Sequence, residues 1–450
     1  MKKLLYTICL LLALLCIFTA CDKQEAPQTE PNPTDTENKQ PAHVHSFGEW
    51  TVLESSNCAT QGKEKRTCTC GESETRTLDI SSHSFANGVC LLCGATDGLA
   101  YKASTDGTSF LVNGIGTCAA TDIVIPAYRD GKPITGIEEN AFLNCTALVS
   151  VKIPATVKKI GGAAFAGCTS LTTVEMAEGV TEIGEEAFYA CTQLSRITLP
   201  ASIQKATSPF INCPSLQYTL YNNGKYLGNT TTPCLYLAGV ADTTVSFFEV
   251  ATGTKIIDNA FHECTALSSI TLPTSLSCIS GDAFYDCTTL TNVFITDLAA
   301  WCAIEFSDSP DTPFYRASNL YLNNTLVTHL DIPSSVTELK KYAFYGCESI
   351  TSVTLPDGMT SIASYAFRKC IALASLTIPA SVINIGYNAF GECSSLTAVN
   401  FAQTDGWWCA DSASATNGTA ISTAALSSSS VAATCLTSNY CYKVWHRTVE

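Results

Sequence analysis

A fixed order of hydrophobic and polar positions recurs along most of the chain, and residues 373–393 show it well. Leu376 and Ile378 alternate with polar neighbours, which is the pattern of a short strand with one buried face. Pro379 follows them, and because proline offers no backbone N–H to a sheet, it predicts the end of that strand. Each copy of the pattern therefore begins with a short strand.

The second half of the copy returns to hydrophobic residues. Val382 and Ile385 are expected to point inward again, and Gly386 is expected to permit a bend. Phe390, which follows a small alanine, is expected to fill the centre of the coil. Cys393 then closes the turn as a small buried side chain with a weak S–H donor.

The copies can be counted by the string A-F-x-x-C, which occurs eight times and once more in the variant form PFINC. Most copies lie 23 residues apart, whereas Cys213 to Cys264 spans 51 residues and Cys287 to Cys347 spans 60. A period held over this length predicts a stack of similar coils. The nine repeat cysteines are Cys145, Cys168, Cys191, Cys213, Cys264, Cys287, Cys347, Cys370 and Cys393.

One such coil leaves an apolar face open on both sides, so only stacking against neighbours can bury it. The predicted fold is a repeat solenoid of the leucine-rich repeat class: a right-handed coil with a parallel β-sheet of short strands and irregular turns. β-rich insertions are expected near 214–250 and 295–325, where the long steps occur. Caps are expected over 98–122 and 401–450, because an exposed terminal coil would aggregate.

This pattern resembles the BspA-type leucine-rich repeats of bacterial surface proteins, also called the Treponema-type repeat. The resemblance covers roughly residues 98–450, with the repeats themselves at 123–400. It implies the fold of that family and its recurring β-rich insertions, and members of the family are described as adhesins or host-interaction proteins. Fold alone does not carry function, since repeat families diverge in their choice of partner.

The first residues predict export and a lipid anchor. Two lysines precede an apolar run over residues 4–18, which is shorter than a membrane span of about 20 residues and indicates a signal peptide over residues 1–20. The sequence before Cys21 resembles the bacterial lipobox, so Cys21 is the predicted lipidation site. Residues 21–42 are polar and proline-rich, as in an extended tether. The alternative is an ordinary signal peptide in which Cys21 has no role.

A small separate module rich in cysteine and histidine follows over residues 43–97. Two closely spaced cysteine pairs, each followed by glycine, predict a structural zinc site with four thiolates. The segment resembles the zinc-ribbon-like repeats found near the N-terminus of many bacterial surface proteins, although its first pair is C-x-C. A disulfide-stapled module and a decayed remnant are the alternatives. The predicted ligands are Cys68, Cys70, Cys90 and Cys93, with His45, Cys58 and His83 as alternates.

The composition of the chain argues against two classes of function, nucleic-acid binding and catalysis. Only 14% of the 450 residues are charged, and the net charge is −15, whereas a nucleic-acid binder needs clustered Lys and Arg to neutralise phosphates. An enzyme is disfavoured too, because the chain has no G-x-S-x-G elbow, phosphate loop or dinucleotide fingerprint. Among the 24 cysteines, the nine equivalent repeat thiols indicate packing, since a nucleophile is needed once. They are predicted to be buried free thiols.

The outward face of the repeat strands is the predicted recognition surface, because Ser, Thr and a few charged residues recur there. The alternative is that threonine simply suits exposed strand positions. The candidate partner-binding residues are Lys152, Glu175, Arg196, Thr198, Thr271, Thr354 and Thr377. The C-terminal aromatic residues are expected to cap the last coil, with a carbohydrate-binding patch as the alternative; they are Trp407, Trp408, Tyr440, Tyr442 and Trp445.

These features predict a monomeric, lipid-anchored protein of the bacterial cell envelope, at the cell surface or outer membrane. Its solenoid is predicted to be a non-catalytic recognition surface for protein–protein interaction or for adhesion to host or neighbouring cells. The expected partners are a protein or glycan on the solenoid face and the membrane through the N-terminal lipid, with structural zinc as the expected cofactor. The alternatives are a carbohydrate-binding protein, an envelope-structural protein and an accessory to a hydrolase.

Overall fold

The computed structural model describes residues 45–58 and 61–448. The predicted signal peptide, Cys21 and the predicted tether lie outside the described residues. By its internal contacts the chain divides into two units, each described by itself. Among the described residues, 45–49 and 66–74 belong to the first unit, and the remainder, including all of the repeats, belongs to the second.

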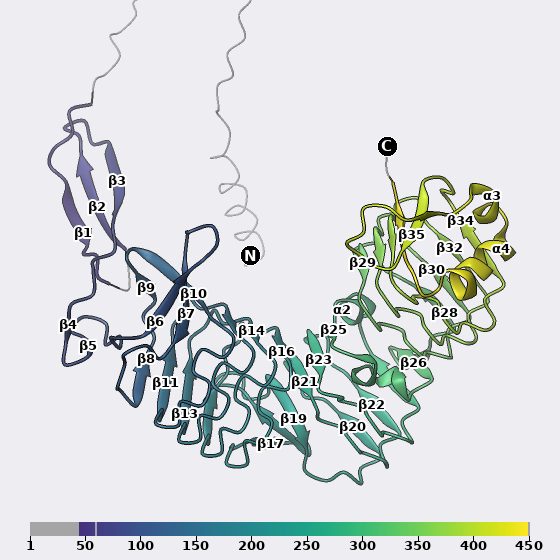
Figure 1. The fold of residues 1–450 in the computed structure, drawn as a ribbon, viewed down its shortest axis with the longest axis horizontal. Helices are drawn as coiled ribbons and strands as arrows, with labels where there is room; N and C mark the ends of the chain where they lie inside the picture. The colour runs from purple at the N-terminus through teal and green to yellow at the C-terminus, as the bar shows by residue number, and fades with distance from the viewer. Residues whose placement is uncertain (1–44, 59–60, 449–450) are drawn as a thin grey trace, which may run out of the picture. The chain divides into compact units, whose positions relative to one another are not determined.

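The predicted solenoid fold is confirmed, because successive coils stack through parallel strands (Figure 1). The strands predicted from the alternating pattern form a first ladder in three runs. These runs are β8 (Asp122–Val124), β11 (Ser150–Ile153), β13 (Thr173–Met176) and β15 (Arg196–Thr198); β20 (Phe247–Glu249), β22 (Ser269–Thr271), β24 (Asn292–Ile295) and β26 (Asn319–Leu322); and β28 (His329–Asp331), β30 (Ser352–Thr354), β32 (Ser375–Ile378) and β34 (Ala398–Phe401).

The structure adds a second parallel ladder, built from the part of the repeat that reads V-x-x-I-G in copies such as 382–386. The strands are so short that most contribute two residue pairs to a neighbour. This ladder consists of β7 (Phe110–Gly114), β10 (Lys132–Ile137), β12 (Lys159–Ile160), β14 (Glu182–Ile183) and β16 (Lys205–Ala206); β19 (Tyr236–Val240), β21 (Ile256–Asp258), β23 (Cys278–Ser280) and β25 (Glu305–Phe306); and β29 (Glu338–Leu339), β31 (Ser361–Ile362) and β33 (Asn384–Ile385).

A glycine follows four of the second-ladder strands, β12, β14, β23 and β33, and at each of them the neighbouring coil approaches closely. A Cβ on Gly184 would lie 2.6 Å from the backbone N of Gly162, and one on Gly386 would lie 2.2 Å from that of Ser364. The bend expected at Gly386 is therefore not the main reason for a glycine at this position. A side chain there would push two coils apart.

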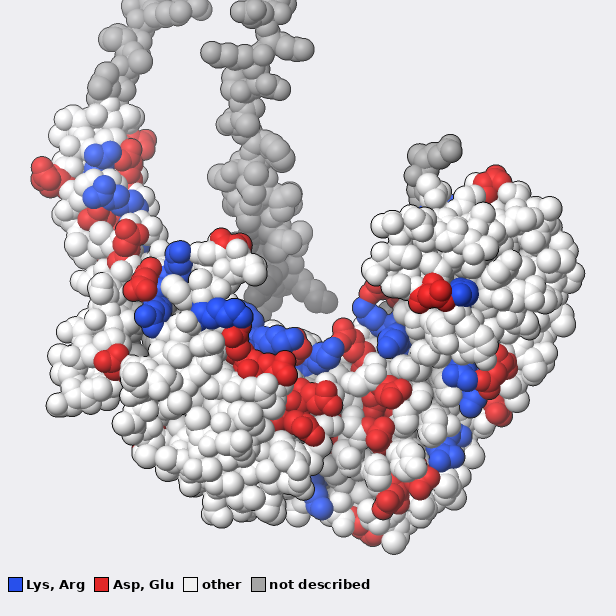
Figure 2. All heavy atoms as spheres, viewed as in Figure 1, with Lys and Arg blue, Asp and Glu red and all other residues white. Residues whose placement is uncertain are grey.

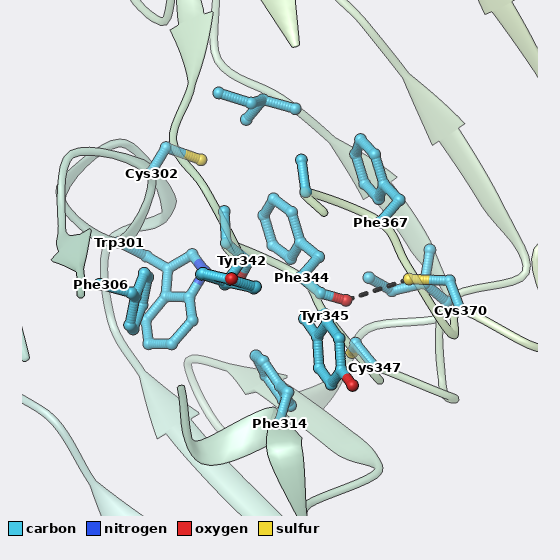
Figure 3. Packing of buried hydrophobic residues seen from close by; sticks show 14 of the residues in the cluster. Trp301, Cys302, Phe306, Phe314, Tyr342, Phe344, Tyr345, Cys347, Phe367 and Cys370 are labelled. Carbon is cyan, nitrogen blue, oxygen red and sulfur yellow. Dashed lines mark hydrogen bonds between the residues drawn. The ribbon is translucent and has the colours of Figure 1, made fainter. Parts of the chain in front are cut away.

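Stacked phenylalanines and cysteines fill the centre of the coils. Phe142, Phe165 and Phe188 lie with ring centroids 4.9 and 5.2 Å apart and nearly parallel planes. Six of the nine repeat cysteines also donate to a phenylalanine carbonyl of the coil before them. Cys191 Sγ donates to the Phe165 carbonyl at 3.1 Å, and Cys370 makes the equivalent contact, drawn in Figure 3. The described repeat cysteines are free thiols. Burial raises the pKa of most of them, for example to about 12 at Cys168.

Two interruptions of the repeat stay joined to the solenoid. In the first, β17 (Thr219–Tyr221) and β18 (Gly224–Leu227) pair antiparallel with each other, and β18 pairs with β19. The second contains the elements α2 (Leu298–Cys302), η1 (Ser309–Asp311), η2 (Pro313–Tyr315) and β27 (Thr325–Leu326). Trp301 of α2 packs beside Phe306 and Phe314, as Figure 3 shows, and donates its indole N–H to the Ala343 carbonyl at 3.0 Å.

Additional strands and helices close both ends of the ladders. At the N-terminal end, β6 (Ala100–Ala103) pairs antiparallel with β7, and β9 (Tyr128–Arg129) pairs with β10. At the C-terminal end, β37 (Val444–Arg447) pairs antiparallel with β33 and so covers the last strand of the second ladder. The other C-terminal elements are β35 (Trp407–Ala410), β36 (Thr419–Ala420), α3 (Thr423–Leu426), α4 (Ser429–Thr434) and η3 (Cys435–Asn439).

Short strands also occur ahead of the solenoid, in the cysteine- and histidine-rich segment. They are β1 (Thr51–Glu54), β2 (Gly62–Thr67), β3 (Ser73–Leu78), β4 (Phe85–Ala86) and β5 (Val89–Cys90). In the described part of the chain, every helix is too short or too polar to cross a bilayer.

Candidate functional site

The predicted recognition residues all stand on first-ladder strands. Lys152, Glu175 and Thr198 occupy the same register on β11, β13 and β15 and point outward, and Arg196 lies two positions before Thr198. Lys152 and Glu175 form an exposed ion pair of 3.2 Å. The structure thus brings four of the seven predicted residues together.

The other three predicted residues lie in the later runs of the first ladder. Thr271 is on β22, whereas Thr354 and Thr377 are on the adjacent strands β30 and β32. All three are at least partly exposed. The predicted row is therefore present as separate patches in the three runs of the ladder.

A second surface, which the sequence pattern did not single out, follows the outward positions of the second ladder. We call it the charged row; it consists of Lys159, Glu182, Lys205, Glu305 and Glu338. On β12, β14 and β16 the register places lysine, glutamate and lysine side by side. Figure 2 shows charged atoms of both signs gathered over these strands and over β25. The signal that could have found this row is the residue just before the buried Ile, Ala, Phe or Leu of each second strand.

The charges within this row pair with one another at the surface. The Lys159 Nζ lies 2.8 Å from a Glu182 carboxylate oxygen, and the Lys205 Nζ lies 3.0 Å from Glu305. The hydrogen bond to Glu305 raises the pKa of Lys205. Each exposed pair contributes at most about 1 kcal/mol to stability, so these groups are available to a partner at little cost to the fold.

Two hollows lie over the charged row. One, of about 410 Å³, has Gly136, Gly161, Gly162 and Gly184 among its lining residues and Glu138, Glu139, Glu185, Lys159 and Glu182 around them. The other, of about 540 Å³, is lined by Lys205, Glu305, Glu338, Lys340 and Lys341 with several uncharged neighbours. The four glycines among its lining residues add no side chains to the first hollow. The adjacent acidic residues Glu138 and Glu139 are part of this surface.

The cysteine- and histidine-rich segment contains a group of four possible metal ligands. The ligand atoms of Cys58, His83, Cys90 and Cys93 all lie within 4.8 Å of one another. Cys58 and Cys90 are buried, and their sulfurs are 3.5 Å apart. The Cys93 sulfur is 3.5 Å from the Nδ1 of His83.

A tight turn shapes the Cys90 end of this group. The Gly94 amide donates to the Cys90 carbonyl at 2.9 Å, and Gly94 has a left-handed φ of 72°. Burial raises the pKa of the Cys90 thiol, but hydrogen bonds from the backbone amides of Cys93 and Leu92 outweigh it and bring the pKa to about 5. The turn therefore favours a thiolate at Cys90.

A second group of three residues belongs to the other unit of the chain. It consists of His45, Cys68 and Cys70, whose ligand atoms also lie within 4.8 Å of one another. The Nδ1 of His45 is 3.2 Å from the Cys70 sulfur. The predicted set of Cys68, Cys70, Cys90 and Cys93 is thus divided between two groups. The reason is that each cysteine pair gathers its own histidine, and Cys58 completes only the group at Cys90.

Side chains of the catalytic types meet at one exposed place. The Nδ1 of His329 lies 2.6 Å from the Ser352 hydroxyl, and its Nε2 lies 2.9 Å from an Asp331 oxygen. The side chains of His329 and Asp331 are 51% and 73% exposed on an open sheet face. Water competes for all of these hydrogen bonds, and the arrangement lacks the enclosed site that nucleophilic catalysis uses.

The C-terminal aromatic residues mostly face the core. Trp407 and Trp445 are 2% and 1% exposed and pack edge to face with ring centroids 6.1 Å apart. Trp408 is half-buried and stacks on the ring of His446, whereas Tyr442 is exposed. These contacts are those of residues that cover a coil, and a sugar-binding platform would need aromatic faces open to solvent.

The repeats match the family described as BspA type leucine-rich repeat region, in six copies over residues 116–231, 242–304 and 317–429, which is more than half of the chain. Among curated proteins, none matches. Among solved structures, the chain is similar to a leucine-rich repeat protein from Bacteroides ovatus, with 24% identity, 68% of this chain and 88% of that chain covered, and a TM-score of 0.28.

Two further solved structures are similar to the chain. One is a leucine-rich cell surface protein from Faecalibacterium prausnitzii, with 21% identity, coverage of 69% and 94%, and a TM-score of 0.28. The other is a leucine-rich repeat protein of T. pallidum, with 19% identity, coverage of 66% and 88%, and a TM-score of 0.23. At these TM-scores the whole chains do not superpose closely.

Proposed function

Because the chain belongs to the BspA-type leucine-rich repeat family, we propose that it is a non-catalytic protein of the bacterial cell surface whose solenoid binds a protein partner. Adhesion to host or neighbouring cells is the role that this binding would serve. The protein is exported and held at the envelope by a lipid on Cys21, with residues 21–42 as the tether.

The observation that carries the proposed binding function is the charged row over the second ladder. On β12, β14 and β16 its two lysines and one glutamate alternate along stacked coils, so a partner would meet both signs of charge there at a spacing of about 4.8 Å. Proteins present both signs on their surfaces and can match such a row, and electrostatic complementarity of this kind chiefly gives specificity and fast association. The two hollows over the row are recesses that side chains of the partner would occupy.

A pair of charge swaps tests which face binds. Exchanging the charges in Lys159→Glu with Glu182→Lys keeps the ion pair and the net charge but reverses the pattern of the charged row. The same exchange in Lys152→Glu with Glu175→Lys is the matched control on the first ladder. Binding of the labelled full chain to cultured epithelial cells and to neighbouring bacteria should weaken about tenfold in the first variant only.

Other outcomes of this experiment would place the partner elsewhere or contradict the proposal. Weakening by the first-ladder exchange alone would place the partner on the face that contains Lys152, Glu175 and Arg196. Unchanged binding in both variants would contradict recognition by charged solenoid faces. Protease treatment of the target cells should abolish binding, and loss of binding after glycosidase treatment alone would instead indicate a glycan ligand.

Growth with radiolabelled palmitate tests the proposed anchor. The wild type should incorporate label and Cys21→Ala should not, whereas an unlabelled wild type would refute the lipid anchor.

Protease added to intact cells tests the proposed surface exposure. It should degrade the solenoid, and full protection would contradict a role in adhesion.

A further inference from the structure

The four-residue group at Cys58, His83, Cys90 and Cys93 has the composition and dimensions of a tetrahedral zinc site. Zinc–sulfur and zinc–nitrogen bonds of about 2.3 and 2.0 Å place two sulfurs about 3.8 Å apart and a sulfur and a nitrogen about 3.5 Å apart. The Cys58 and Cys90 sulfurs are 3.5 Å apart, and the Cys93 sulfur is 3.5 Å from His83 Nδ1. All four ligand atoms lie within 4.8 Å of one another, so each pair is at most about 1 Å longer than these tetrahedral separations require.

The imidazole of His83 is already oriented for coordination. Its Nε2 lies 2.9 Å from the backbone carbonyl oxygen of Tyr128, an atom that can only accept a hydrogen bond. The proton therefore sits on Nε2, which leaves the Nδ1 lone pair facing the thiols. A carbonyl that fixes the tautomer in this way is the usual outer partner of a histidine that binds zinc.

The segment has almost no other core of its own. The buried cluster around these residues consists of Cys58, Cys90 and Ala95, with Cys93 packed against it. Three of these four members are the thiols themselves. A segment of this size needs a metal or covalent links to hold its shape, because its apolar burial is too small.

This same segment is hydrogen-bonded to the first strand of the first ladder. Thr96 exchanges two hydrogen bonds with Val124 of β8: its amide donates to the Val124 carbonyl, and its hydroxyl accepts from the Val124 amide, both at 2.9 Å. The contact of His83 with Tyr128 adds a third link. The side of β8 that does not pair with β11 is therefore covered by residues next to the four ligands.

We propose that Cys58, His83, Cys90 and Cys93 bind one zinc ion, and that the bound ion holds residues 83–97 against β8 as the N-terminal cap of the solenoid. The ion connects Cys58 to the turn at Cys90 and fixes the ring of His83, whose other nitrogen reaches the solenoid backbone. The cap thus depends on metal where the C-terminal cap depends on apolar packing around Trp445.

Metal analysis of the full chain, purified in reductant, loaded with zinc and desalted, tests the site. The double variant Cys90→Ser with Cys93→Ser should contain one zinc fewer per chain than the wild type. The matched control, Cys68→Ser with Cys70→Ser, should keep that zinc, since it alters only the other group. His83→Ala should lose the zinc and His83→Cys should retain it, which separates loss of a ligand from failure to fold.

Several outcomes would overturn the site. They are a zinc-free wild type after loading, an unchanged zinc content in the Cys90 and Cys93 double variant, or a Cys58–Cys90 disulfide that persists in the protein as purified from the envelope. Cobalt in place of zinc should give the visible absorption of a tetrahedral site with thiolate ligands, and an octahedral spectrum would contradict the proposed ligand set.

Hydrogen exchange tests the capping role. Removal of zinc by a chelator in the presence of reductant should speed amide exchange at residues 83–97 and in β8, while β32 and β34 keep their wild-type rates. An unchanged exchange rate in β8 after the metal has left would overturn the capping role.

Discussion

At the scale of single residues, the tight turns of the repeat depend on backbone conformations that most side chains disfavour. In each repeat the first and the fifth residue before the cysteine have a positive φ. This geometry costs an ordinary L-residue about 1–2 kcal/mol and costs glycine nothing, with asparagine and aspartate in between. The residues at these positions are Asn140, Asn144, Ala163, Gly167, Glu186, Ala190, Ser208, Asn212, Asn259, Glu263, Asp282, Asp286, Tyr342, Gly346, Tyr365, Lys369, Asn388 and Glu392.

Ala190 is therefore a site at which glycine should stabilise the protein. Its φ is 55°, so Ala190→Gly removes strain that exceeds the extra entropy glycine brings to the unfolded chain, and the free energy of unfolding should rise by about 0.5–1 kcal/mol. Urea unfolding measures the change. Ala374→Gly, at an exposed position without a positive φ, should lower stability by about 0.5–1 kcal/mol. An equal loss in both variants would show that Ala190 is unstrained.

At the scale of elements, the two ladders differ in how much of them could be predicted. The first ladder was predictable because residues such as Val151 and Ile153 alternate with outward polar ones over several positions. The second ladder was not, since a strand of two residues such as Lys159–Ile160 has no alternation to detect. Its existence follows from stacking between coils, which is a contact between residues about 23 positions apart.

Because neighbouring coils approach closely at the second ladder, adding one methyl group there should strongly lower the stability of the protein. Gly184→Ala should lower the free energy of unfolding by about 1–3 kcal/mol, because the new Cβ would lie 2.6 Å from the backbone N of Gly162 and must push the coils apart. Gly358→Ala is the control, since no atom lies within 4 Å of the Cβ position and its φ is not positive. Equal stabilities for the two alanine variants would contradict the steric account of the repeat glycine.

The short helix η1 contains a buried carboxyl that should make stability depend on pH. Asp311 is 1% exposed, and burial raises its pKa to about 7 in spite of hydrogen bonds from the amides of Asp308 and Ala283. In the unfolded chain the pKa is about 3.9, so between these two values the folded state holds a proton that the unfolded state has lost. Stability from this group is therefore greatest near pH 4 and falls as pH rises to 7, by up to about 4 kcal/mol.

Asp311→Asn removes this titration and should reduce the fall of the unfolding free energy with pH between 5 and 8. The measurement is urea unfolding at several pH values in that range. Asp357→Asn, a change at an exposed carboxyl, should retain the wild-type slope. A wild-type slope in Asp311→Asn would mean that the carboxyl is ionised in the folded protein.

At the scale of the whole molecule, the period of the repeat was enough to predict the fold class, whereas the sites depend on which copies meet. The sequence placed Cys68 and Cys70 with Cys90 and Cys93 because their spacing matches one zinc site. The structure instead groups each pair with its own histidine, and nothing in linear spacing distinguishes Cys58 as the ligand that completes one group. The charged row escaped notice for the same reason, since its members are distant in sequence and aligned only by stacking.

The buried core of the solenoid divides into two clusters, which meet at the first interruption of the repeat. On β18 and β19, Leu227 and Tyr236 belong to the N-terminal cluster, while Tyr226 and Leu237, their neighbours in sequence, belong to the C-terminal one. A solenoid is stabilised by contacts between adjacent coils. A destabilising mutation at one end should therefore lower the local stability of nearby coils and leave distant coils unaffected.

Trp445→Ala tests this division. Trp445 lies in the C-terminal cluster beside Trp407 and Phe401, and its loss should cost about 3–5 kcal/mol at that end. Amide exchange should then accelerate in β31, β33 and β35, while β11 and β13 keep their protection because they belong to the other cluster. Trp408→Ala, which removes a half-buried ring from β35, should have a much smaller effect. Uniform acceleration from β8 to β37 would instead show that both clusters unfold as one cooperative unit.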